Sequence, residues 1–474
     1  MSATGIVVAT LVCYQLVLLS VGYWARHRAA TTAGYFIGDR NLGPFVASLS
    51  YAAGSSSAWS ILGVSGIAFS QGLGSVWLIP GTITGHLVVW YWLAPRLRDA
   101  AASGRWLTLT DLLVRNLTGV ARRVTYRLAA LVIIVSFTFY IAAQFQGAAN
   151  TFTAVFQFDF HLALIVGAAV VLIYTLWGGF WAVSLTDALQ ALLMLIAALL
   201  LPAVALYTVG GFKGLVASAE PAHLSLLSSH QGWFAVGFFL GMLSIGFGPL
   251  GQPHLLNRIM ALKDLQAIRV ARRVAVSWFV VVLGGMYILG LCGHVLVQAA
   301  SEQVFFVLAE SLLPPVLTGV LIAAVLSAIM STADSQLLVA GAALSHDLRD
   351  GKSDQRSAVR AGRLAVFGVA LGAVLLAALV PESIFSRVLF AWNALGAAFG
   401  PLVIAQLTGW RGASWAAPAS IAVGFGLTVV FYSLPNGPGD IWERGIPFLA
   451  AALMLWAARG SRQRVSVGEA GVKP

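Results

Sequence analysis

Charged residues are scarce in this chain. Asp, Glu, Lys and Arg make up 9% of its 474 residues, whereas soluble domains contain about 25%. Hydrophobic residues make up 59%, and the mean hydropathy is +0.87. Apolar runs of about 18 or more residues recur along the chain, and each is long enough to cross a bilayer. The sequence therefore predicts a polytopic, all-α membrane protein, because a transmembrane barrel would show short alternating segments instead.

Cysteine and sequence patterns typical of catalysis are scarce too. Cys13 and Cys292 both lie in apolar runs, so we interpret them as packing residues and infer no redox chemistry. His86, His254 and His294 fall on separate predicted spans. None has a neighbour in sequence that would complete a metal cluster or a nucleophile–base pair. We therefore do not expect an enzyme, and we expect no sensor domain after the last span.

The apolar runs predict about thirteen transmembrane helices. They are expected at 5–24, 43–69, 73–95, 124–149, 161–181, 186–209, 232–252, 272–298, 315–345, 361–380, 384–408, 413–432 and 446–459. No cleavable signal peptide is expected. We interpret 1–474 as a single transmembrane transporter domain, with a disordered cytoplasmic tail at 460–474.

The basic residues predict the orientation of these spans. All but three of the 28 Lys and Arg residues lie in, or beside, one set of alternate connections; the exceptions are Lys213, Arg387 and Arg444. Cytoplasmic loops carry the excess of Lys and Arg. The N-terminus is therefore predicted outside the cell membrane and the C-terminus in the cytoplasm. The net charge of +11 then reflects topology, and we expect no nucleic-acid partner.

Two predicted spans contain helix-breaking residues. The first is interrupted at 54–57 (GSSS) and the second at 246–253 (GFGPLGQP), five spans later. Broken helices in a membrane are tolerated where neighbouring helices or a cavity satisfy the backbone. Two five-helix repeats, near 43–209 and 232–408, would each open with a broken helix and would be inverted relative to each other. Transporters use this arrangement, although kinks without a function stay an alternative.

A polar stripe interrupts the apolar segment 323–338. Ala328, Ser331, Thr332 and Ser335 follow an i, i+3, i+4, i+7 spacing, which places them on one helix face. Their hydroxyls, with any carbonyl freed nearby, suit a hard monovalent cation. Alternatively, the hydroxyls bond to their own helix or to neighbouring helices.

Asp187 is a rare carboxylate close to a predicted span. Since its predicted helix begins at 186, one interpretation is a residue in the first turn, where the helix dipole favours a negative charge. The other is a carboxylate on an inner ion pathway.

Five stretches together resemble the sodium/solute symporter family, and most closely the sodium/proline symporters within it. They are GYFIGDRNLG at 34–43, LIYTLWGGFWAVSLTD at 172–187, GQPH with RIMA within 251–261, MSTADSQLL at 330–338, and AW with GAAFGP within 391–401. The resemblance covers nearly the whole chain. It implies a five-plus-five inverted repeat of the leucine-transporter type, with one additional helix before the repeats and two after them.

The resemblance also implies a sodium site between the first broken helix and the helix with the polar stripe. Carried over by position, its ligands are the carbonyls of Ala53, Ser56 and Ala328 and the hydroxyls of Ser331 and Thr332. Asp187 matches a carboxylate on the sodium release path of the family. The expected activity is sodium-coupled symport of a small organic solute, with Na⁺ as the coupling ion and no obligatory protein partner.

The solute pocket departs from the pattern of the sodium/proline symporters. Ser55 stands where they carry an acidic residue, and Ile245 and Pro249 stand where they carry aromatic residues. The polar and aromatic residues predicted to face the solute are Ser57, Trp59, Tyr140, Gln144, Gln252, Trp392 and Asn393. Proline is therefore one expected solute, and pantothenate, another carboxylate, a sugar or another amino acid stay open. Proton coupling on the same fold is a further alternative.

Overall fold

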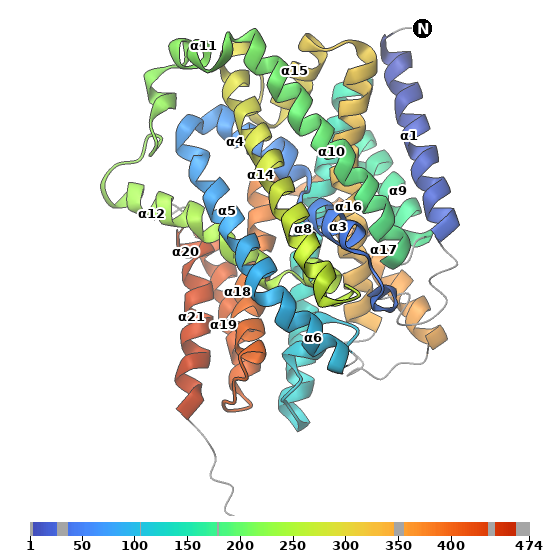
Figure 1. Cartoon of the computed structure of the whole chain (residues 1–474), viewed down its shortest axis with the longest axis vertical. Coiled ribbons are helices and arrows are strands. Elements are labelled where there is room, and N and C mark those ends of the chain that lie inside the picture. The colour runs from blue at the N-terminus through green and yellow to red at the C-terminus, as the bar shows by residue number, and fades with distance from the viewer. Residues whose placement is uncertain are drawn as a thin grey trace, which may run out of the picture.

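The computed structural model describes residues 3–25, 37–104, 106–177, 180–345, 355–434 and 441–460. These residues form a bundle of helices that run mostly side by side (Figure 1). The β pairing in the described part is one isolated parallel bridge between Leu42 and Leu262. The prediction of an all-α protein is therefore confirmed. The predicted tail at 460–474 lies outside the described residues except for its first residue.

The α-helices have the following bounds: α1 Ala3–Ala25, α3 Pro44–Ser55, α4 Val64–Gln71, α5 Leu78–Leu87, α6 Ala94–Gly104, α7 Leu109–Leu113, α8 Gly119–Phe156, α9 Phe160–Trp177, α10 Phe180–Thr208, α11 Gly211–Ser218, α12 Gly232–Ser244, α13 Pro253–Met260, α14 Leu265–Leu296, α15 Val304–Leu312, α16 Pro315–Ser345, α17 Gln355–Leu379, α18 Ile384–Leu407, α19 Ala416–Ser433, α20 Ile441–Arg444 and α21 Ile446–Ala457. Short segments of 3₁₀ or π helix connect some of them. Segment η3 Trp59–Gly63 is π helix, and the 3₁₀ segments are η4 Gly72–Trp77, η6 Pro221–Leu224, η7 Ile245–Gly251 and η8 Ser301–Gln303.

Eight helical stretches in the described part are long and apolar enough to cross a membrane. One of them, Trp59–Gly104, joins the end of the second predicted span to the whole of the third through η4. Three shorter apolar helices and the 12-residue helices α3 and α21 coincide with other predicted spans. Every predicted span therefore corresponds to helix, whereas the count of thirteen stays a prediction.

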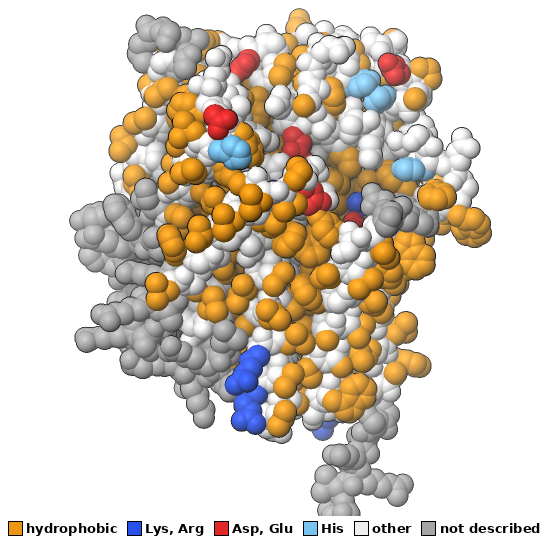
Figure 2. Space-filling model, turned by 180° about the vertical axis from the view of Figure 1, so that it is seen from behind, with side chains coloured by type: hydrophobic (Ala, Val, Ile, Leu, Met, Phe, Trp, Pro, Cys, Tyr) orange, Lys and Arg blue, Asp and Glu red, His pale blue; other side chains and the backbone are white. Residues whose placement is uncertain are grey.

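Large apolar side chains on the outside of the bundle fit a lipid environment. On α17, Leu364, Leu371, Leu375 and Leu379 are half or more exposed, and their spacing places them on one helix face. Figure 2 shows hydrophobic side chains over most of the middle of one face of the molecule. A soluble monomer rarely exposes so much contiguous apolar surface, whereas a membrane protein does so against lipid.

Both helix-breaking segments lie inside the bundle. Helix α3 ends at Ser55, and Ser56 has φ −104° and ψ 82°, outside the helical region. At the second site, Gln252 is extended (φ −81°, ψ 107°) between η7 and α13. Pro253 then starts α13, a position that suits proline because the missing N–H would have no helical partner. The Nε2 atom of His254 lies 3.1 Å from the Gly54 carbonyl oxygen, so the two interrupted segments touch.

Glycine allows α5 to approach η7 very closely. A Cβ atom added at Gly85 would lie 2.1 Å from the carbonyl oxygen of Gly246. Small residues at such crossings let helix backbones pack directly in membranes. The position of the second interrupted segment therefore depends on the absence of a side chain at residue 85.

We expect Gly85→Ala to lower the free energy of unfolding by about 1–3 kcal/mol, because the new methyl group would push two backbones apart. Gly284→Ala on α14 is a matched control, since a Cβ atom there meets nothing within 4 Å. The control is expected to be neutral or to stabilise by up to about 1 kcal/mol through its higher helix propensity. Thermal unfolding of both purified variants measures the difference, and equal midpoints would contradict the packing argument.

Candidate functional site

Five oxygen atoms from two helices meet where α3 ends. The Ser331 hydroxyl donates to the carbonyls of Ala53 and Ala328, both at 3.3 Å. The Thr332 hydroxyl lies 3.4 Å from the Ala53 carbonyl and 3.3 Å from that of Gly54. All of these residues are buried. We call these three carbonyls and two hydroxyls the oxygen cluster.

The chain break frees one of these carbonyls. In a continuous helix the Gly54 carbonyl would accept a hydrogen bond from the amide of residue 58. Here the Ala58 amide donates instead to Oε1 of Gln144, at 3.0 Å, and Gln144 Nε2 donates to the Tyr140 carbonyl, at 3.4 Å. Gln144 on α8 therefore holds the helix open, and the Gly54 oxygen contacts the Thr332 hydroxyl at 3.3 Å and Nε2 of His254 at 3.1 Å.

The oxygen cluster contains four of the five predicted sodium ligands and adds Gly54. The fifth, Ser56, follows directly after α3, and its amide donates to the carbonyls of Ala52 and Ala53 at 3.0 Å. Its hydroxyl is buried and has no hydrogen-bond partner among the described residues. The role of the Ser56 carbonyl as a ligand stays a prediction.

A buried ion pair lies next to the oxygen cluster. Asp187 Oδ2 accepts from Arg258 Nη2 at 2.9 Å and from the Ser50 hydroxyl at 2.7 Å. Arg258 also donates to Ser50 Oγ at 2.8 Å, to the His254 carbonyl at 2.5 Å and to Ser335 Oγ. We call Ser50, Asp187, Arg258 and Ser335 the inner charge cluster. It joins α3, α10, α13 and α16.

Asp187 is the eighth residue of α10 and is fully buried. The alternative that it sits in the first turn of its helix is therefore wrong. The prediction started the helix at residue 186, whereas the helix extends back at least to Phe180. Its second oxygen, Oδ1, has no partner among the described residues.

The inner charge cluster is hydrogen-bonded to a residue of the oxygen cluster. The Ser335 hydroxyl donates to the Ser331 carbonyl at 2.7 Å. On the other side, Arg258 and Ser335 line a small cavity with room for about one water molecule (20 Å³). Asp334 is also buried: Oδ1 accepts from Ser335 at 3.3 Å, and Oδ2 has no partner in the described part. Hydrogen bonds therefore connect Arg258 of the inner charge cluster, through Ser335, to Ser331 of the oxygen cluster.

A second cavity, lined largely by aromatic and aliphatic side chains, lies among α5, α8, α14, α18 and the broken segments. Its lining residues are Ser55, Trp59, Ser60, Thr82, His86, Tyr140, Ile245, Phe279, Leu283, Val388, Leu389 and Trp392. The space open to a water-sized sphere is only about 10 Å³, about enough for one water molecule. We call it the central cavity. In this conformation its side chains must move before an organic solute can enter.

Three of the seven predicted solute residues, Trp59, Tyr140 and Trp392, line the central cavity. Ser57 lies behind them, and its hydroxyl oxygen accepts from the Trp59 amide at 3.1 Å and from Tyr140 at 3.5 Å. Ser55 and Ile245, two of the three positions that depart from the proline symporter pattern, also line it, whereas the third, Pro249, is not among the lining residues.

The predicted residues with amide side chains lie outside this lining. Gln144 binds the Ala58 amide at the break after α3, and Gln252 Nε2 donates to the Trp392 carbonyl at 3.0 Å. The amide group of Asn393 is buried and has no partner among the described residues. Direct contact between these side chains and a solute stays a prediction.

His86 is a cavity residue that the sequence analysis did not select. Its Nδ1 lies 3.0 Å from the Tyr51 hydroxyl and its Nε2 lies 3.5 Å from the Ser55 hydroxyl. The ring stacks on Phe279, with centroids 3.8 Å apart. A histidine inside a transmembrane run is itself a signal, because a buried polar side chain needs partners. Those partners are far away in sequence, so spacing alone did not reveal them.

A larger vestibule approaches the central cavity from one side. It has a volume of about 710 Å³, and Leu389 lines both spaces. Trp59 and Phe385 stack at this boundary, with ring centroids 5.9 Å apart. Glu382, Glu443 and Arg444 line the vestibule, so its walls carry charge whereas those of the central cavity do not. Leu389 and the Trp59–Phe385 pair therefore lie at the boundary between the two spaces.

Comparisons with known proteins agree with this architecture. Residues 35–416 match the sodium:solute symporter family. The high-affinity proline transporter PutP of Bacillus subtilis is 34% identical over 449 residues, 92% of this chain and 94% of that protein. The osmoregulated proline transporter OpuE of B. subtilis is 34% identical, with 90% and 88% covered. A sodium/proline symporter of Staphylococcus aureus is 34% identical, with 88% and 84% covered.

Solved structures with the same fold include a Na⁺-coupled sialic acid symporter, with a TM-score of 0.78 and 16% identity over 95% of this chain and 98% of that one. Mhp1, a nucleobase-cation-symport-1 family transporter, follows with a TM-score of 0.57 and 14% identity over 90% and 94%. At these identities the likeness shows the fold alone, which is of the leucine-transporter type. Together with the family match and the relatives of similar length, it confirms the predicted resemblance: the chain is a multi-pass membrane protein and belongs to the sodium:solute symporter family.

Proposed function

We propose that the protein is a sodium-coupled symporter of a small organic solute, with proline as the first solute to test. The observation that carries the proposal is the oxygen cluster, which joins the broken end of α3 to the continuous helix α16. Its relatives include proline transporters of Bacillus subtilis and sodium/proline symporters of Staphylococcus aureus. Residues that depart from those symporters line the central cavity, so another solute is the second candidate.

The spacing within the oxygen cluster suits a cation of sodium's size. Ordinary hydroxyl hydrogen bonds measure about 2.7–2.8 Å between oxygens, whereas these oxygens lie 3.3–3.4 Å apart. Oxygens bound about 2.4 Å from one hard cation, as around Ca²⁺, lie roughly 3.4 Å apart when they subtend a right angle. The cluster is neutral, which favours a monovalent ion that must also leave again. We propose Ala53, Ser56, Ala328, Ser331 and Thr332 as ligands, with Gly54 in addition.

Sodium binding and solute binding would be coupled through the broken helix. An ion held between α3 and α16 fixes the end of α3, and Ser55 at that end lines the central cavity. The positive ends of the half-helices that begin after the two breaks would favour a solute carboxylate, and here the Ala58 and Trp59 amides donate to Gln144 and Ser57. Trp59, Tyr140 and Trp392 would enclose its apolar part. Each ligand then favours the same closed conformation, which is the requirement for coupling.

Sodium would be released to the cytoplasm along the inner charge cluster. We propose that sodium passes Asp187, whose free Oδ1 is not engaged by the described residues. We propose, from the distribution of Lys and Arg, an orientation with the N-terminus outside and the C-terminus inside the cell, the vestibule outside and the inner charge cluster on the cytoplasmic side. The carboxylate would attract the ion, and the paired Arg258 would keep that attraction weak enough for release.

Sodium entry would supply the free energy for accumulation of the solute. One charge that crosses about 100 mV gains about 2.3 kcal/mol, and a tenfold sodium gradient adds about 1.4 kcal/mol. Together they allow on the order of several hundredfold accumulation of solute for one sodium ion.

Uptake of labelled proline into proteoliposomes tests the proposal. With an inward sodium gradient we expect concentrative uptake, and we expect none when choline replaces sodium. A proton gradient in sodium-free buffer tests the proton alternative. If proline fails but sodium still binds, unlabelled amino acids, pantothenate, other carboxylates and sugars are screened for protection of the protein against thermal unfolding. Absence of sodium binding would contradict the symporter proposal itself.

A further inference from the structure

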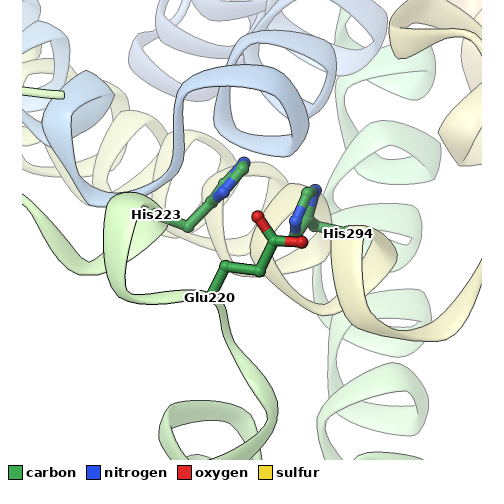
Figure 3. A group of neighbouring side chains, drawn as sticks. All are labelled: Glu220, His223 and His294. Atoms are coloured by element: carbon green, nitrogen blue, oxygen red, sulfur yellow. The ribbon is translucent and has the colours of Figure 1, made fainter. Parts of the chain in front are cut away.

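We propose that Glu220, His223 and His294 form a binding site for a zinc ion, away from the oxygen cluster and the central cavity. Figure 3 shows the two imidazole rings side by side, with the Glu220 carboxylate directed at them. One ligand atom from each residue lies within 4.8 Å of the other two. The residues come from two parts of the chain: the segment around η6 and the last turn of α14.

Two nitrogens and one carboxylate oxygen form a ligand set that zinc uses. Ligands about 2.0–2.2 Å from a tetrahedral zinc ion lie roughly 3.3–3.6 Å apart. The three donors would therefore move by about 1 Å, which is a small change for the exposed side chain of Glu220 and the half-buried His223. A fourth position would stay open to water. Calcium and magnesium are less suitable, because they prefer all-oxygen sites.

The hydrogen bonding of the histidines fits metal binding. Neither ring nitrogen of His223 has a partner among the described residues, although both are buried. The ring of His294 packs edge-on against the ring of Phe69, with centroids 5.6 Å apart. This contact restricts the orientation of the imidazole. The rings of His223 and His294 stack with centroids 3.5 Å apart, which places ring nitrogens of both residues close together.

The site would connect segments from different parts of the fold. The carbonyl oxygen of His223 lies only 2.3 Å from where a Cβ atom of Gly72 would be, so η6 sits directly on η4. Trp77 Nε1 on η4 also donates to the Leu226 carbonyl, at 2.8 Å. Zinc would add a bond from this packed pair to the end of α14. The segment with η6 connects the two repeats, so bound zinc would restrict their relative motion.

Zinc titration of the full-length protein in lipid nanodiscs, without a polyhistidine tag, tests the site. We expect one zinc ion per chain by calorimetry, and a visible absorption band of tetrahedral Co²⁺ when cobalt replaces zinc. His223→Ala and His294→Ala should each weaken zinc binding by about tenfold or more, and Glu220→Gln should weaken it less. His161→Ala is the control, because His161 is exposed on α9 and lies outside the cluster.

Three results would overturn the site: no zinc binding by the unmodified protein, unchanged binding by the His223→Ala/His294→Ala variant, or an equal loss in His161→Ala. Thermal unfolding without metal shows whether each variant is folded. Zinc should raise the midpoint of the unmodified protein and of His161→Ala, but not that of His223→Ala/His294→Ala. The effect on transport rests on the proposed function: external zinc should slow uptake by the unmodified protein and leave His223→Ala unaffected. A failure of uptake with intact zinc binding would count against the transport proposal and not against the site.

Discussion

Thr332→Ala is expected to weaken the apparent sodium affinity by about 10- to 100-fold. The variant removes one hydroxyl oxygen from the oxygen cluster and leaves the packing of α16 almost unchanged. Loss of one interaction with a charged partner costs about 1.5–3 kcal/mol, and each 1.4 kcal/mol is a factor of ten in affinity. The sodium concentration that gives half-maximal uptake, together with direct sodium binding to the purified protein, measures the effect.

Ser345→Ala on the same helix is the matched control. Ser345 is buried, and its hydroxyl donates to the Gly341 carbonyl at 2.7 Å. This is an ordinary bond within one helix turn, far along α16 from the cluster. We expect its sodium affinity to be unchanged. Unchanged sodium affinity in Thr332→Ala would remove Thr332 from the proposed ligands, and equal weakening in both variants would point to a general effect on α16.

The bilayer explains why the fold could be predicted from the sequence. Every backbone polar group in lipid must be satisfied internally, so long apolar runs can only be helices, and each predicted span coincides with helix. The polar stripe could also be predicted from the sequence, because a helix places Ala328, Ser331 and Thr332 on one face. The chain breaks were visible as GSSS and GFGPLGQP. Each of these features is determined by residues that are neighbours in the chain, so it can be recognised from the sequence alone.

Contacts between distant segments could not be predicted in the same way. Arg258 and Asp187 are 71 positions apart. The sequence around either residue does not indicate that the two side chains form an ion pair. Gln144 resembled a solute ligand, but it binds the Ala58 amide and holds the helix break. His86 had no sequence partner, because Ser55 and Tyr51 lie one span earlier. Sequence patterns identified which segments were polar, and only packing decided what each polar group touches.

Asp187→Asn is expected to lower the free energy of unfolding by about 3–5 kcal/mol, because it leaves a buried guanidinium without its counter-charge. The side chains of Arg258 and Asp187 are 2% and 0% exposed, so water cannot replace the lost partner. Asp99→Asn is the control: Asp99 pairs with Arg98 at 3.4 Å, and its side chain is 54% exposed. Exposed pairs contribute about 0–1 kcal/mol, so this variant should unfold close to the parent temperature.

The double variant Asp187→Asn/Arg258→Gln separates the structural role of Asp187 from its proposed role on the sodium release path. Removing both charges leaves no unpaired ion in the bundle, and replacing buried ion pairs is often neutral for stability. We therefore expect the double variant to recover most of the stability lost in Asp187→Asn. Sodium-driven uptake should nevertheless stay low, because the carboxylate that attracts the departing ion is still missing. Recovery of stability and uptake together would assign the pair to folding alone and would exclude Asp187 from the release path.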